Sequence, residues 1–116
     1  MNYKVIDLTY LDEVSTSFVF IKKMIDLFRT NLSEFERDMK LALGNDDFSS
    51  LSELAHKAKS SVMIFGMEKQ AGDMKSLEFD IKCLKNKDTY ENRVNNFLAS
   101  CKEALIDIEK LEQGME

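Results

Sequence analysis

Apolar residues recur at every third or fourth position through the first half of the chain, and this spacing constrains the fold more than any other feature. The series comprises Phe18, Ile21, Ile25, Phe28, Leu32, Phe35, Met39 and Ala42. Alternating steps of three and four place these side chains on one face of an α-helix. A long helix with one apolar face must bury that face against other elements.

Three further apolar stripes with the same spacing follow along the chain. They run from Phe48 to Phe65, from Met67 to Leu84, and from Val94 to Ile108. The segments between the stripes are short, and short connections favour antiparallel neighbours. The sequence therefore predicts an all-α fold, an antiparallel up-down four-helix bundle.

Helix-start and helix-end patterns set the expected boundaries within a single domain covering residues 1–116. Gly44 is followed by candidate N-caps, and Gly66 separates the second stripe from the third. Thr9 to Asp12 also begins like a capped helix, which predicts a short extra N-terminal helix at about 9–15. We expect the bundle helices at about 17–43, 47–65, 67–85 and 89–112.

Composition and charge exclude several classes of protein. The 116 residues include no proline and four glycines, too few turn formers for an all-β domain of this size. The net charge of -5 disfavours nucleic acid as a partner, because phosphate binding needs a basic surface. The longest apolar run, Val62 to Met67, cannot span a bilayer, and the N-terminus lacks a signal-peptide pattern. We expect a cytoplasmic monomer that does not associate with membranes.

Metal and thiol chemistry find little support in the sequence. Cys83 and Cys101 are far apart, and the chain holds a single histidine. Metal sites need several convergent ligands, so no metal site is expected and both cysteines are interpreted as small core residues. A metal-binding bundle would need a second copy of the Glu-x-x-His pattern that Glu53 and His56 form once.

His56 is the remaining candidate for chemistry. It lies one position off the apolar stripe that contains Ala55 and Ala58, so its imidazole is expected to reach solvent. Its own face of the helix carries Ser52, Lys59, Ser60 and Met63, and Lys57 is adjacent. Cationic donors beside a neutral imidazole suit the transfer of a phosphoryl group. Spacing alone leaves open that His56 is a surface histidine without a function.

The residues around His56 resemble the signature of histidine-containing phosphotransfer (HPt) domains. The resemblance is carried by Ala55-His56-Lys57-Ala58-Lys59-Ser60-Ser61, followed by Gly66 and then by Leu77-Glu78. A pattern like that of the family's short first helix occurs at Ile6 to Leu11, so the likeness covers roughly residues 6 to 112. One position departs from it, because the family most often has glycine where this chain has Ser60.

The resemblance implies a specific activity and a role for each residue. HPt domains relay a phosphoryl group between aspartyl-phosphate receiver domains of response regulators or hybrid histidine kinases. His56 would accept and donate the group, and Lys59 would stabilise its oxygens with Lys57 as an auxiliary. Glu78 would orient the imidazole, although an exposed carboxylate without a role is an equal reading of that residue. Ser60 would keep the approach to the imidazole open.

The same resemblance assigns the remaining chemistry to the partner. The chain has no phosphate-binding glycine-rich loop, so no autonomous kinase activity and no bound cofactor are expected. The Mg²⁺ that the transfer needs would be held by the receiver domain. Docking would use the surface around His56, with contributions from Ser52, Met63, Ile64 and Met67. Filling of gaps in the core is the competing reading of the methionines, above all of Met67.

A different class of function fits the same stripes. A non-catalytic helical adaptor would bind a partner protein through an exposed apolar face, and replacing His56 would leave it active.

Overall fold

The computed structural model describes residues 18–115 and is helical almost throughout, with no strand among those residues. Its elements are α2 (Phe18–Gly44), α3 (Phe48–Met63), α4 (Glu68–Lys82), the 3-10 helix η1 (Lys87–Thr89) and α5 (Tyr90–Met115). The prediction of an all-α fold with four long helices is confirmed. The short helix expected at about 9–15 lies outside the described residues.

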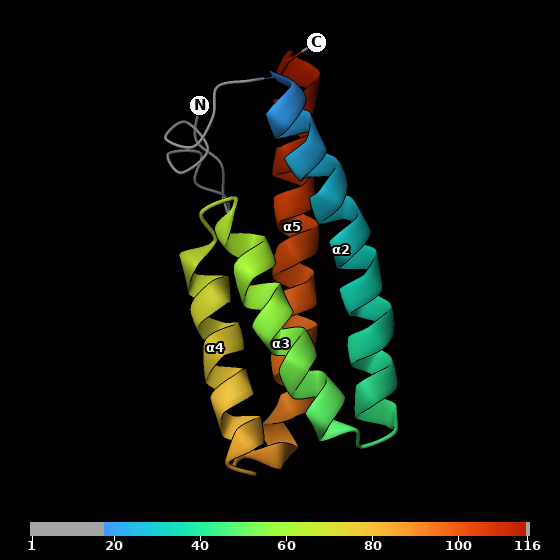
Figure 1. Cartoon of the computed structure of the whole chain (residues 1–116), viewed down its shortest axis with the longest axis vertical. Helices are drawn as coiled ribbons and strands as arrows, with labels where there is room; N and C mark the ends of the chain where they lie inside the picture. Colours follow the sequence, from blue (N-terminus) through green and yellow to red (C-terminus); the bar gives the residue numbers. More distant parts are fainter. Residues whose placement is uncertain (1–17, 116) are drawn as a thin grey trace.

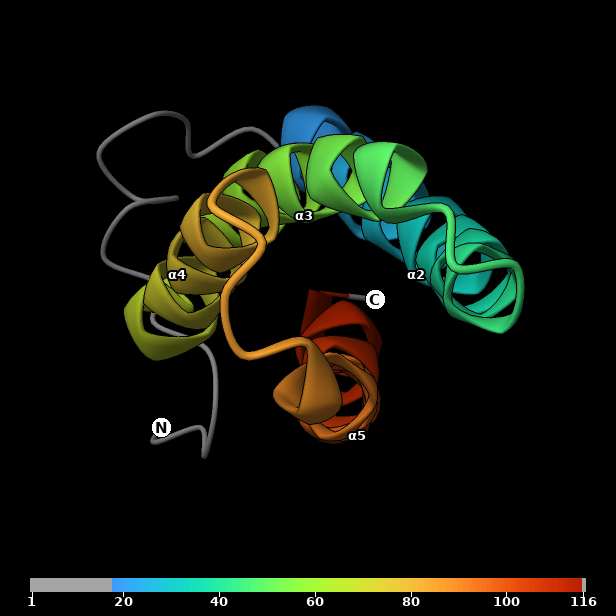
Figure 2. The ribbon, with the colours of Figure 1, turned by 90° about the horizontal axis from the view of Figure 1, so that it is seen from below.

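The four helices lie side by side in a bundle 45 Å long (Figure 1). In Figure 1 the sequence colours run downward along α2 and α4 and upward along α3 and α5. Seen along the bundle, α4, α3 and α2 form an arc that faces α5 (Figure 2). Each helix contacts the next one in the chain or in the ring: α2 with α3, α3 with α4, α4 with α5, and α5 with α2.

The apolar stripes form the core, as their spacing predicts. On α2, the side chains from Ile25 to Ala42 that belong to the stripe are buried, and on α3 Leu51, Ala55, Ala58 and Val62 are buried. Phe65 from the α3–α4 turn packs edge-on against Phe28 of α2, with ring centroids 5.3 Å apart. Burial of such side chains contributes about 1.5–3 kcal/mol each, so these stripes supply most of the stability of the bundle.

The end of α4 differs from the prediction. The third stripe was expected to continue to Leu84, but α4 ends at Lys82 and the side chain of Leu84 is 62% exposed. Leu84 and Asn86 both have positive φ, so the chain leaves the helix through two left-handed residues. Cys83 is consequently exposed, which makes its interpretation as a core residue wrong, whereas Cys101 is buried as expected.

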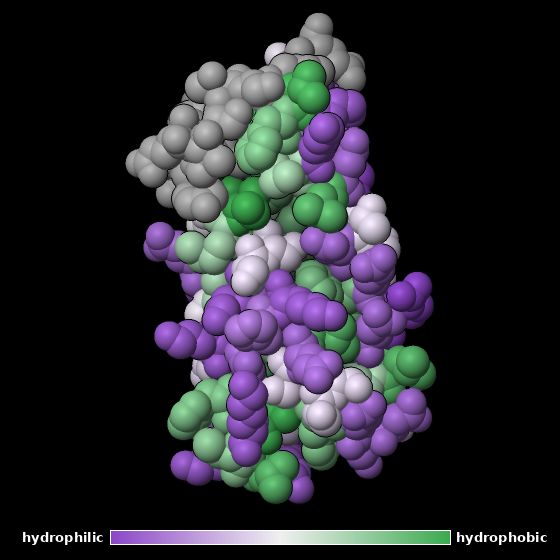
Figure 3. All heavy atoms as spheres, viewed as in Figure 1, coloured by the Kyte–Doolittle hydropathy of each residue, from purple (hydrophilic) through white to green (hydrophobic). Residues whose placement is uncertain are grey.

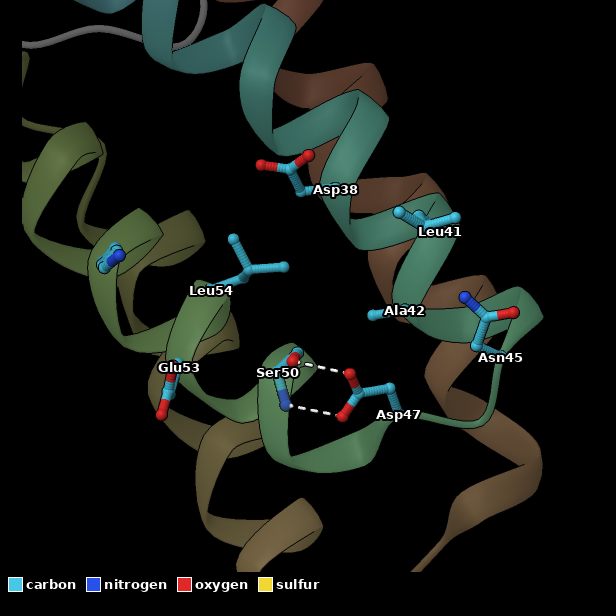
Figure 4. Close-up of a pocket in the computed structure, with 9 residues that line it drawn as sticks. Asp38, Leu41, Ala42, Asn45, Asp47, Ser50, Glu53 and Leu54 are labelled. Atoms are coloured by element: carbon cyan, nitrogen blue, oxygen red, sulfur yellow. Dashed lines mark hydrogen bonds between the residues drawn. The ribbon is translucent and has the colours of Figure 1, made fainter.

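Local capping explains where α3 begins. Asp47 is its N-cap, and the carboxylate accepts hydrogen bonds from the backbone N–H and the hydroxyl of Ser50 (Figure 4). The left-handed residue of this turn is Asp46, with φ 50°, while Gly44 is the last residue of α2. The sequence pattern therefore located the turn correctly, and Asp47 is one of the N-cap candidates that follow Gly44.

Gly66 makes the tight connection between α3 and α4. Its φ of 68° lies in the left-handed region that favours glycine, and its N–H donates to the carbonyl of Met63. This turn is what sets α3 and α4 against each other, because Glu68 begins the next helix two residues later. The two helices that carry the candidate site are thus joined by one short link.

Candidate functional site

His56 lies in the middle of α3 on the side that faces solvent. The neighbouring Ala55 and Ala58 are fully buried, which orients the helix so that the His56 side chain stays 60% exposed. A helix residue one position from a buried stripe sits at its edge, within reach of both solvent and the adjacent helix. The imidazole is therefore accessible to a large partner and also contacts α4.

The contact with α4 is made by Glu78. Its Oε1 lies 3.2 Å from Nδ1 of His56, and its Oε2 accepts a hydrogen bond of 2.8 Å from Nζ of Lys82. The hydrogen bond from Lys82 lowers the pKa of the Glu78 carboxyl, with a further lowering from His56, against an opposing effect of burial. Glu78 is therefore a carboxylate at neutral pH and is only 12% exposed.

This geometry assigns the proton on the imidazole. A carboxylate can only accept a hydrogen bond, so the Nδ1 of His56 must carry the hydrogen in the pair with Glu78. In the neutral ring the other nitrogen, Nε2, then keeps its lone pair. Nε2 of this exposed side chain is then the nucleophilic nitrogen. The tautomer of the ring is set by Glu78, which lies on another helix.

A groove of about 310 Å³ surrounds this pair. It is lined by Ser52, Glu53, His56, Lys57, Glu78 and Lys82. Figure 3 shows hydrophilic side chains across the middle of the face that α3 and α4 form, with hydrophobic ones toward its lower end. The structure thus brings Lys57 and Glu78 to the His56 groove, together with Lys82, which sequence reasoning missed.

Lys59 and Ser60 line a neighbouring groove rather than the one that holds His56. That groove, of about 350 Å³, also includes Met63, Ala71, Gly72 and Lys75. Within the described part of the chain, neither Lys59 nor Lys75 forms an ion pair. Lys59 is half-buried and lies one helical turn from His56 on the same side of α3.

The residues expected to contact a partner differ in exposure. Met63 is 37% exposed and Ile64 is half-buried, so both can contribute to a surface. Met67 cannot, because it is fully buried where the turn brings α3 and α4 together, and its expected docking role is wrong. Ser52 is only 7% exposed, which limits it to lining the floor of the His56 groove.

A third hollow, between α2 and α3, is acidic. It is lined by residues that include Asp38, Asp47, Glu53 and Leu54 (Figure 4). Asp47 is already used to cap α3, and Asp38 pairs with Arg37 at 2.8 Å. Among residues 18–115 no group of three or more His, Cys, Asp or Glu side chains is arranged to hold a metal ion.

Comparison with known proteins gives no family assignment. The chain matches no protein-family model, no curated protein and no solved structure. In the described residues, no helix has the length and apolar character needed to cross a membrane. Function is therefore inferred from the side chains around His56.

Proposed function

We propose that this chain is a histidine phosphotransfer protein, in which His56 accepts a phosphoryl group from the aspartyl phosphate of one receiver domain and passes it to another. The observation that supports this most directly is the 3.2 Å contact between Nδ1 of the exposed His56 and the carboxylate of Glu78. In the neutral ring, a proton held on Nδ1 by this contact leaves the lone pair on Nε2, and the His56 side chain is 60% exposed. The connections between helices and their order along the bundle fit an up-down antiparallel HPt-like bundle, which the proposal includes.

The transfer of the phosphoryl group to His56 needs no additional proton donor or acceptor. The lone pair on Nε2 of His56 attacks phosphorus, an N–P bond forms, and the bond from phosphorus to the receiver's aspartate oxygen breaks. The aspartate leaves as a carboxylate, and the ring becomes a phosphoryl-imidazolium that still carries its proton on Nδ1. Glu78 stabilises that developing positive charge because its carboxylate already accepts from Nδ1. Transfer to the next receiver is the reverse reaction.

Positive charge for the phosphoryl oxygens comes from the lysines of α3. Lys57 lines the His56 groove, and Lys59 lies one turn further along the same helix without an ion-pair partner among the described residues. The partner supplies Mg²⁺ and the in-line aspartate, so catalysis is shared between the two proteins. The chain itself then acts as a phosphocarrier rather than as a kinase.

The surface around His56 is the proposed docking face. Its centre is the charged groove, and its edge carries the half-exposed Met63 with Ile64 beside it. Methionine adapts its shape to different surfaces, which suits a protein that must bind both a donor and an acceptor receiver. In this proposal the protein works in the cytoplasm as a monomer.

A transfer assay tests the proposal. A receiver domain is phosphorylated with a small-molecule donor and mixed with this protein and Mg²⁺, and acid-labile, base-stable phosphate is then sought on the chain. Wild type and His56→Gln are compared, both checked for helical content by circular dichroism. Label on wild type alone supports the proposal. Absence of label on a folded wild type with several receivers overturns it.

The alternative function is a non-catalytic adaptor. It is favoured by large apolar side chains that remain exposed on the described surface, including Phe79 in α4 and Leu84 just after it, which are 61% and 62% exposed. If the protein is an adaptor, the His56→Gln substitution should leave its affinity for the partner unchanged. Co-purification with a partner that is unaffected by this substitution, together with a failed transfer assay, would support the adaptor.

A further inference from the structure

The Glu78 carboxylate has two partners, the imidazole of His56 and the ammonium group of Lys82. Oε1 faces Nδ1 of His56 on α3, while Oε2 accepts from Nζ of Lys82 on α4 itself. Among the described residues Lys82 is the one cation bonded to this carboxylate. The three side chains form a chain of contacts that begins on the surface of α4 and ends at the exposed Nε2.

The spacing on α4 explains why Lys82 reaches Glu78. The two residues are four positions apart, with the acidic residue first, which is the favourable order for an ion pair along a helix. Lys82 also lies in the last turn of α4, where a positive charge interacts favourably with the helix dipole. These two interactions could give Lys82 a purely structural role, in stabilising α4. A useful test must therefore measure a property of His56 that the stability of α4 does not change.

A glutamate side chain has three rotatable bonds, so a single contact at 3.2 Å leaves its carboxylate free to turn away. A second hydrogen bond to Oε2 removes that freedom and fixes Oε1 opposite Nδ1. The other charged residues near the pair do not replace it. Glu53 and Lys57 line the same groove, Lys59 lies on α3 beyond it and Asp38 approaches from α2, yet no hydrogen bond joins any of them to Glu78.

We infer that Lys82 is a positioning residue that acts on His56 through Glu78, holding the carboxylate where it keeps the proton on Nδ1 and the lone pair on Nε2. The functional meaning of this inference rests on the proposed phosphotransfer. The effect of Lys82 on the His56 tautomer does not depend on phosphotransfer, because the tautomer is a property of the unphosphorylated protein.

The tautomer can be read directly because the chain has only one histidine. Two-bond ¹H–¹⁵N correlation spectra of uniformly ¹⁵N-labelled protein, recorded in the basic limit of the histidine titration, report how the proton is divided between Nδ1 and Nε2. An imidazole free in water favours the proton on Nε2, whereas a carboxylate facing Nδ1 favours the other form. Glu78→Ala defines the spectrum without the carboxylate.

The test compares Lys82→Met with two matched variants. Lys82→Arg keeps a cationic donor at the same position. Lys69→Met removes a lysine that forms an ion pair of the same spacing with Asp73 on the same helix, at 2.9 Å, without touching Glu78. Lys69→Met therefore controls for the loss of one charge and one helix-surface pair. Circular dichroism and thermal melting establish that each variant is folded.

The expected result is a proton mainly on Nδ1 in wild type, Lys82→Arg and Lys69→Met. Lys82→Met should shift at least half of the way toward the Glu78→Ala spectrum, and it should slow phosphoryl transfer while Lys69→Met does not. A folded Lys82→Met with the wild-type tautomer overturns the inference, and so does a wild type with its proton on Nε2. A shifted tautomer in a protein that accepts no phosphate would overturn the proposed function alone.

Discussion

Glu78 on α4 and His56 on α3 meet at 3.2 Å through Nδ1, so the state of an exposed imidazole depends on a carboxylate from a neighbouring helix. The two helices are joined by the short turn at Gly66 and pack closely along their length. This packing makes the distance between the two side chains a property of the bundle. Because one partner lies on each helix, the contact can be tested by substituting either His56 or Glu78.

Replacing Glu78 tests the contribution of its carboxylate. Glu78→Ala should slow phosphoryl transfer to His56 by roughly tenfold or more, because a hydrogen bond to a charged group contributes about 1.5–3 kcal/mol. Glu78→Gln should lose less, since its amide oxygen can still accept from Nδ1. Initial rates with one phosphorylated receiver measure the effect. Equal rates for wild type and a folded Glu78→Ala would show that the contact does not assist transfer.

Lys59 is expected to contribute charge rather than structure. Lys59→Ala should slow transfer by roughly tenfold while leaving the melting temperature nearly unchanged, because the residue forms no ion pair in the described structure and a charge-assisted bond to phosphate is lost. Lys110→Ala, on α5, is a control for the loss of one charge. Unfolding of Lys59→Ala would instead assign the residue a structural role.

The two methionines beside the site should respond in opposite ways. Met67 is fully buried, so Met67→Ala should reduce the free energy of unfolding by about 2–5 kcal/mol. Met63 is 37% exposed, so Met63→Ala should change stability by less than about 1 kcal/mol and should weaken receiver binding if docking uses this face. Urea unfolding gives the first quantity and titration calorimetry with a receiver gives the second. A reversed order of stabilities would contradict this assignment.

The sequence predicts the helices well because stripe spacing and caps are local signals. It fails at the end of α4, where Leu84 continues the stripe but the chain has already left the helix. A contact from α5 accompanies this change, because the single hydroxyl proton of Tyr90 is directed at the carbonyl of Lys85 at 2.6 Å and is shared with that of Asp80 at 3.1 Å. The Asp80 carbonyl also accepts from the backbone N–H of Lys85, so the segment that follows α4 is held both to the helix end and to Tyr90. A contact between two helices cannot be inferred from the spacing within one.

The sequence likewise predicts most residues of the His56 groove that the site uses, but not Lys82. The positions of His56, Lys57 and Glu78 follow from the residues that resemble a known signature, and the structure places all three around one groove. Lys82 was missed because a lysine in a surface helix is usually no more than solvated charge. Its place four residues after Glu78 was the available signal, and it gains meaning only once Glu78 is known to face His56.

Stability in acid should depend on Glu112, which joins α5 to α2. It accepts hydrogen bonds from Arg29 at 2.6 Å and from Lys22 at 2.7 Å, and these lower its pKa to about 2. Because the folded-state pKa lies below the unfolded value of about 4.5, the stabilisation is complete above pH 4.5 and is lost as the pH falls toward 2.

Glu112→Gln should therefore melt at a lower temperature than wild type at neutral pH, and the difference should shrink progressively between about pH 4.5 and pH 2. Glu103→Gln, an exposed substitution on the same helix, controls for the change in net charge. Thermal melts followed by circular dichroism across this range provide the comparison. A difference between wild type and Glu112→Gln that stays constant down to pH 2 would show that the Glu112 charge does not hold α2 and α5 together.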